Sequence, residues 1–158
     1  MNRLSMILVA AIAALGPALG DDVPFAEPAV KNDASAVTLA DIMGATQWRH
    51  IKLWYAIKAK NWELLDYELG KLTDTFDRAA TLYHYIPIEF IVAGVKPIIA
   101  MREAISTKNK AKLETGFAEL TDACNACHRA AQVGFIVIQT PTFSPLTDQK
   151  FSPTQSAQ

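Results

Sequence analysis

The sequence has only two cysteines and three histidines in 158 residues, and this scarcity limits the sites it can build. A closed structural zinc site needs about four cysteine or histidine ligands, and beside His128 only His50 and His84 remain. The cysteines, Cys124 and Cys127, are three positions apart, so a disulfide between them would close a very short loop and constrain little of the unfolded chain. Zinc and a structural disulfide are therefore poor explanations for the cysteine pair.

The chain also lacks an excess of basic residues. It has 15 Lys+Arg against 16 Asp+Glu, a formal net charge of −1. A nucleic-acid-binding protein neutralises phosphates with a basic patch or stripe, and the sequence has no such stripe. We therefore expect no nucleic acid among the partners.

After the first 20 residues, the sequence contains no apolar run long enough to span a membrane. Residues 1–20 combine Arg3, an apolar run from Met6 to Leu15 and small residues near Gly20, which is the pattern of a secretory signal peptide cleaved after Gly20. An uncleaved anchor is the less favoured reading, because about ten apolar residues are fewer than the roughly 20 that cross a bilayer. The mature protein is expected in the periplasm, without a stable membrane span.

Residues 21–37 contain two prolines and no apolar period, and we predict a flexible lead-in there. From residue 38 to 132, glycine is sparse and helix-favouring residues dominate, which predicts one domain of four helices. Because short connections favour antiparallel neighbours, the predicted fold class is all-α, an antiparallel four-helix bundle with an extended C-terminal tail over 133–158. The expected helices are Thr38 to Lys60, Trp62 to Tyr83, Glu89 to Ile105 and Lys110 to Gln132.

Local signals predict where these helices begin. Thr38 and Asp41 have the spacing of a capping box, and Asn61 and Asn109 are expected to cap the second and fourth helices. Pro97 removes a backbone hydrogen bond, so the third helix is expected to kink or start late at that point. The inward candidates of the second helix are Leu65, Leu72, Phe76 and Leu82.

The segment Cys124-Asn125-Ala126-Cys127-His128 is a haem-attachment pentapeptide. Two thiols separated by two residues on a helix can reach the two vinyl groups on one edge of a porphyrin, and the adjacent His128 then lies over the iron. The apolar residues before it recur in steps of four and three, which places both cysteines toward the bundle interior. A thiol-redox dithiol is the alternative, but it normally opens a helix after a strand. The sequence therefore predicts one covalent haem c, with His128 as an axial iron ligand.

The ligand on the opposite face of the iron is open at this point. Counting along the antiparallel first and fourth helices places Met43 nearest the level of His128, and His50 lies one heptad further along the same stripe. Met43 is the candidate sixth ligand and His50 the alternative; an open site is the third possibility. A helical Met is commonly core, and a lone helical His is commonly structural.

The signal peptide, the four amphipathic helices and the pentapeptide in the last helix resemble the cytochrome c′ class of bundle cytochromes. Met43 to Thr46 is similar to the distal stretch of that class, and the likeness covers residues 38 to 132. The chain also resembles bacterial "cytochrome c family" proteins through Gln47 to Trp54 and Phe135 to Val137. It departs from the c′ pattern by its longer C-terminal tail and by a shorter stretch between the second and third helices.

These features predict an exported monohaem cytochrome that transfers electrons in the periplasm between redox partner proteins. One alternative, implied by the resemblance, is a nitric-oxide-binding protein with an open sixth site, and another is a haem subunit of a larger redox complex. We expect no enzyme, because the sequence offers no distal acid-base set of the kind that assists peroxide cleavage. A homodimer is compatible with the sequence.

Overall fold

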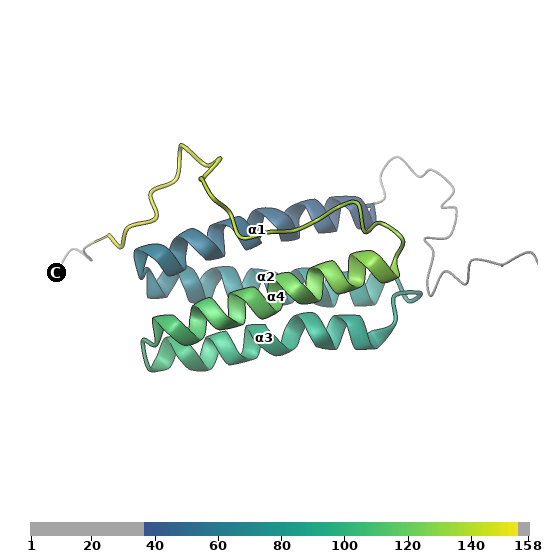
Figure 1. Ribbon diagram of the computed structural model, residues 1–158, viewed down its shortest axis with the longest axis horizontal. Helices are drawn as coiled ribbons and strands as arrows, with labels where there is room; N and C mark the ends of the chain where they lie inside the picture. Colours follow the sequence, from purple (N-terminus) through teal and green to yellow (C-terminus); the bar gives the residue numbers. More distant parts are fainter. Residues whose placement is uncertain (1–36, 155–158) are drawn as a thin grey trace, which may run out of the picture.

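Four helices form an antiparallel bundle in the computed structural model, which describes residues 37–154 (Figure 1). The helices are α1 (Leu39–Ala59), α2 (Trp62–Leu82), α3 (Ile88–Ser106) and α4 (Lys110–Ala130). The predicted all-α bundle is confirmed. The predicted signal peptide, nearly all of the lead-in and the last four residues lie outside the described part of the chain.

The helix starts follow the local signals. At α1 the Thr38 hydroxyl accepts from the Asp41 N–H at 3.1 Å, and the Asp41 carboxylate accepts from the Thr38 N–H at 2.9 Å, which completes the capping box. The side chains of Asn61 and Asn109 each accept a hydrogen bond from the backbone N–H three residues on, at 3.1 and 3.0 Å. These caps satisfy donors that a helix leaves without partners, and they are local enough to be predicted from sequence.

Two expectations were wrong. The helix α3 does not start late, because it begins at Ile88 and runs through Pro97, which is buried inside it. Leu82, expected to face inward, is 51% exposed at the last position of α2. The helical period of apolar residues does not predict burial at that end, because the chain leaves α2 there for the connection to α3.

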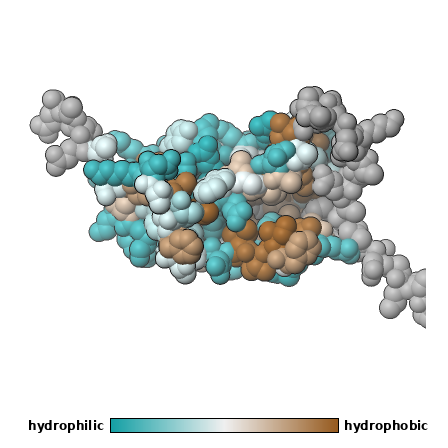
Figure 2. All heavy atoms as spheres, turned by 90° about the horizontal axis from the view of Figure 1, so that it is seen from above, coloured by the Kyte–Doolittle hydropathy of each residue, from teal (hydrophilic) through white to brown (hydrophobic). Residues whose placement is uncertain are grey.

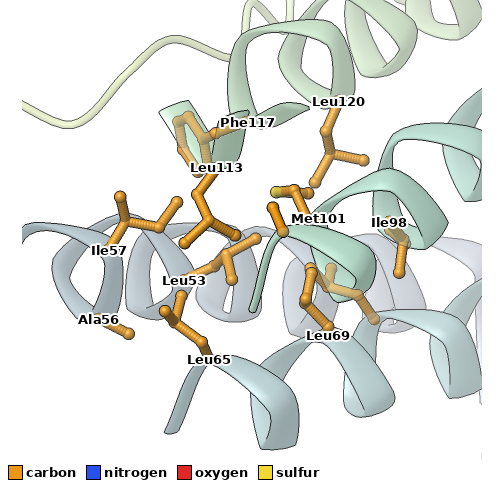
Figure 3. Close-up of a cluster of buried hydrophobic side chains, with 12 residues drawn as sticks. Leu53, Ala56, Ile57, Leu65, Leu69, Ile98, Met101, Leu113, Phe117 and Leu120 are labelled. Atoms are coloured by element: carbon orange, nitrogen blue, oxygen red, sulfur yellow. The ribbon is translucent and has the colours of Figure 1, made fainter. Parts of the chain in front are cut away.

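The bundle is closed at one end and open at the other. At the closed end, side chains from all four helices form one buried cluster, including Leu53, Leu65, Met101 and Phe117 (Figure 3). A second, smaller cluster surrounds Ile42 at the opposite end. The helices α1 and α2, α2 and α3, and α3 and α4 pack closely, whereas α1 and α4 barely touch. This separation leaves room between α1 and α4 at the open end.

The C-terminal tail turns back from the end of α4 and runs along α1 toward the closed end, without regular secondary structure over its described residues (Figure 1). It is held there by Asn61, whose side-chain amide donates to the Phe151 carbonyl at 3.0 Å, and by Tyr55, whose ring packs 5.4 Å from the Phe151 ring. Within the described residues, no helix is both long and apolar enough to cross a membrane.

Candidate functional site

A cavity of about 370 Å³ lies between α1 and α4 at the open end of the bundle. Its walls come from the first half of α1, the last turns of α4, the facing parts of α2 and α3, and the start of the tail, and they are mostly apolar. The volume lies within the range of roughly 300–1,000 Å³ that is usual for ligand and cofactor sites. Met43, His50, Cys124, Cys127 and His128, the residues singled out in the sequence, all line this cavity.

Cys124 and Cys127 lie nearly one turn apart on the cavity wall, both partly buried and both free. Burial raises the pKa of the Cys124 thiol to about 11, with a further contribution from Cys127, and burial also raises the pKa of Cys127. Reactive dithiols have the opposite property, a depressed pKa at a helix start. These cysteines lie near the helix end instead, so the site does not resemble that of a thiol oxidoreductase.

The imidazole of His128 is held in one tautomer. Its Nδ1 lies 2.7 Å from the carbonyl oxygen of Ile136 in the tail. A carbonyl only accepts, so Nδ1 carries the proton and donates it. The lone pair is therefore on Nε2, the atom that this arrangement leaves for a metal. A ligating histidine commonly donates its other ring N–H to a carbonyl or carboxylate in this way.

His50 is a buried, neutral side chain that joins α1 to α4. Its Nε2 lies 2.8 Å from the Thr121 hydroxyl, which itself lies 2.8 Å from the Phe117 carbonyl. The Thr121 proton goes to that carbonyl, because two oxygens at this distance need a hydrogen between them; His50 Nε2 is then the donor. The ring also packs 4.3 Å from the Phe117 ring. Nε2 of His50 is thus committed to a structural hydrogen bond.

The contact between His50 and Thr121 fixes the register of α1 against α4. His128 lies seven residues after Thr121 and Met43 seven residues before His50, so in antiparallel helices Met43 is level with His128. By the same count Gly44 is level with Cys127. His50 lies about 10 Å further along the axis than Met43, at 1.5 Å per residue. Met43 is partly buried and lines the cavity.

Gly44 lies inside α1 with open space beside it. A Cβ atom built at Gly44 would have nothing within 4 Å, whereas one at Gly94 would lie 2.6 Å from the Phe76 ring. A glycine inside a helix costs roughly 0.5–1 kcal/mol relative to alanine. Packing against Phe76 explains Gly94, but no contact of the described residues explains Gly44. The free space at Gly44 belongs to the cavity, opposite the cysteine pair.

These observations fit a covalently attached haem. The thiols of Cys124 and Cys127 would form the two thioether links, and Nε2 of His128 would ligate the iron on one face. The open wall at Gly44 leaves room for a flat ring system on the other side, with Met43 level with the axial histidine. The two thiols and the histidine do not form a zinc site. Within residues 37–154, no group of three His, Cys, Asp or Glu side chains is arranged to hold a metal ion.

Comparison with known proteins supplies no family. No protein-family model matches the chain, and no curated protein or solved structure does so.

The roles of three groups around the cavity were not predicted from the sequence. Thr121, the Ile136 carbonyl and Asn125 each act through a tertiary contact, with His50, with His128 and with the tail respectively. The signals for Gly44 were its place inside a predicted helix and within the segment Met43 to Thr46, which carries part of the family resemblance. For Asn125 the only signal was its place between the two cysteines.

His50 gives the protein a pH-dependent stability. Burial lowers its pKa to about 4 in the folded chain, from about 6.5 when exposed, so the unfolded chain binds one more proton between these values. The unfolding free energy therefore falls as the pH drops from 6.5 toward 4. Between pH 7 and 5 we expect wild type to lose about 2 kcal/mol more than His50→Gln, which keeps an N–H donor for Thr121. Urea unfolding at both pH values measures this difference, and equal losses would refute a buried neutral His50.

Proposed function

We propose that the chain is an exported monohaem c-type cytochrome that transfers electrons in the periplasm. The observation that carries this proposal is the pentapeptide on the cavity wall, with both thiols facing the cavity and the imidazole of His128 fixed so that Nε2 bears the lone pair. The predicted signal peptide supports export to the compartment in which this type of attachment takes place.

Each residue of the site has a role in this function. When bound, haem supplies one-electron chemistry through its ferric and ferrous states. Cys124 and Cys127 tether it, and Nε2 of His128 ligates the iron. The apolar walls limit access of water and so influence the reduction potential. Met43, which lines the same cavity, would donate its thioether as the sixth ligand, a ligand that raises the potential.

The tail supports a role for redox partner proteins. Phe135, Val137 and Phe143 are 81%, 69% and 75% exposed, and Phe135 and Val137 flank Ile136, which lines the cavity. Figure 2 shows apolar residues gathered toward one end of the face that carries α1 and the tail. Exposed apolar side chains beside a cofactor edge are typical of sites where partner proteins dock. The same feature supports the alternative of a haem subunit in a larger redox complex.

The resemblance to the cytochrome c′ class supports a second candidate function, the binding of nitric oxide or a similar small gas. That function requires an iron with a vacant sixth position. Visible spectra of the reduced protein, with and without carbon monoxide, separate the two candidates. An electron carrier with Met43 bound gives a low-spin spectrum that carbon monoxide does not change, and a gas-binding protein gives a high-spin spectrum that carbon monoxide changes.

Gly44 also provides a stability test. In the haem-free chain we expect Gly44→Ala to raise the unfolding free energy by roughly 0.5–1 kcal/mol, because the helix gains propensity and the new methyl group meets nothing. In the haem-loaded protein we expect the gain to vanish or reverse, because the methyl group then meets the ring. Denaturant unfolding of both forms gives the two values.

Gly94→Ala is the matched control, since its Cβ would lie 2.6 Å from the Phe76 ring. Overpacking of this kind costs about 1–3 kcal/mol, and we expect that loss with and without haem. If alanine at position 44 has the same effect in both forms of the protein, the cofactor does not lie against Gly44.

A further inference from the structure

The tail is fastened to the attachment motif by a pair of hydrogen bonds. The side-chain amide of Asn125 donates to the Ile138 carbonyl at 2.8 Å, and the Asn125 carbonyl oxygen accepts from the Ile138 N–H at 2.8 Å. Both polar groups of one tail residue are thus satisfied by a single side chain from within the pentapeptide. We call this pair of hydrogen bonds the Asn125 clamp.

The clamp lies two residues from the contact that orients His128. Ile136 ends a turn, in which its N–H donates to the Val133 carbonyl at 2.8 Å, and Ile138 follows two residues later. Ile138 bonds to Asn125 and the Ile136 carbonyl accepts from His128 Nδ1, so one stretch of tail meets α4 at both places. The turn that brings the tail back is fixed by the Val133 N–H, which donates to the His128 carbonyl at 2.9 Å.

Resting on the proposed function, we infer that Asn125 is a positioning residue: by clamping Ile138 it holds the Ile136 carbonyl against His128 and so sets the orientation and basicity of the axial ligand. A hydrogen bond from Nδ1 strengthens imidazole as a ligand, and loss of such outer contacts typically weakens metal binding by about 10–100-fold. The stronger ligand favours the ferric iron over the ferrous iron. Loosening the clamp is therefore expected to raise the reduction potential.

The test measures the reduction potential of haem-loaded protein by redox titration. Asn125→Ala removes both hydrogen bonds, and Asn125→Asp removes the donor to the Ile138 carbonyl. Ile138→Pro removes the Ile138 N–H that donates to Asn125 and leaves the attachment pentapeptide unchanged. Its potential can therefore be measured even if the variants at position 125 attach less haem. We expect Asn125→Ala and Ile138→Pro to raise the potential, by up to about 59 mV for a tenfold loss of ferric over ferrous preference. Asn125→Asp also adds a negative charge that favours ferric iron, so we expect it to raise the potential less than Asn125→Ala.

Asn61→Asp is the matched control. It makes the same chemical change at the far end of the tail: the carboxylate still caps α2, but the donor to the Phe151 carbonyl is lost. We expect it to loosen the tail there without changing the potential. In Asn125→Ala, the Ile138 amide should also exchange its hydrogen faster than in wild type or Asn61→Asp.

The inference is overturned if Asn125→Ala and Ile138→Pro keep the wild-type potential, or if Asn61→Asp raises the potential as much as they do. Either result would make the clamp part of general tail packing. Failure of the proposed function is seen separately, as wild-type protein that carries no attached haem.

Discussion

The double variant C124A/C127A is expected to lose all covalently bound haem when the protein is made in a periplasm that attaches haem to wild type. In the proposed site, haem is bound covalently only through thioether links to these two cysteines. After acid and organic solvent extraction, wild type should retain its red colour and its haem stain on a denaturing gel, and the double variant should show neither. Each single variant should retain one thioether and an intermediate amount of haem.

The controls separate attachment from folding. Alanine is a good helix former, and both cysteines are only partly buried, so far-ultraviolet circular dichroism of the double variant should still show a helical bundle. His128→Ala should keep its covalent haem but change its spectrum, whereas His84→Ala, an exposed side chain in the connection before α3, should change neither. Covalent haem in the double variant would show that the two cysteines do not attach it.

Met43→Ala is expected to open the sixth position of the iron. The register of α1 against α4 places Met43 level with His128, and removal of its thioether leaves no ligand at that level. The ferrous protein should change from indifference to carbon monoxide to binding it. Its reduction potential should fall by on the order of 0.1 V, within the roughly 0.8 V range that axial ligands span.

His50→Gln serves as the companion variant, because His50 also lines the cavity but its Nε2 is engaged with Thr121. We expect its spectrum and its response to carbon monoxide to match wild type. If His50→Gln opens the site and Met43→Ala does not, His50 is the ligand and its hydrogen bond to Thr121 is broken in the haem-loaded protein. If wild type already binds carbon monoxide as readily as both variants, the sixth position is vacant and the gas-binding function is favoured.

The helices were predictable because their signals are local. Thr38, Asn61 and Asn109 lie within three residues of the groups that they cap, and the predicted starts of α1, α2 and α4 are correct to within one residue. The predicted start of α3 at Glu89 is also within one residue of the observed Ile88, and only the late start at Pro97 was wrong, because a proline inside a helix costs one hydrogen bond that burial of the surrounding helix outweighs. The sequence shows that a proline removes a helical hydrogen bond, but it does not show the tertiary packing that compensates for the loss.

The site was predictable only in part, because some of its contacts are local in sequence and others join distant residues. The attachment motif is a short pattern, and the counting that favoured Met43 agrees with the register set by His50 and Thr121. The role of the tail depends on contacts between residues far apart in sequence, 13 positions for Asn125 with Ile138 and 90 for Asn61 with Phe151. The tail mixes prolines and polar residues with scattered apolar ones, and this composition contains no signal that it folds back along α1.

The intact mass of the exported wild-type protein shows whether haem is attached to the chain. We expect the mass of the chain without residues 1–20 plus one haem, retained under denaturing conditions, together with the ferrous spectrum of a c-type haem. A mass equal to that of the bare chain, or of the chain less two hydrogens from a disulfide between Cys124 and Cys127, would contradict it.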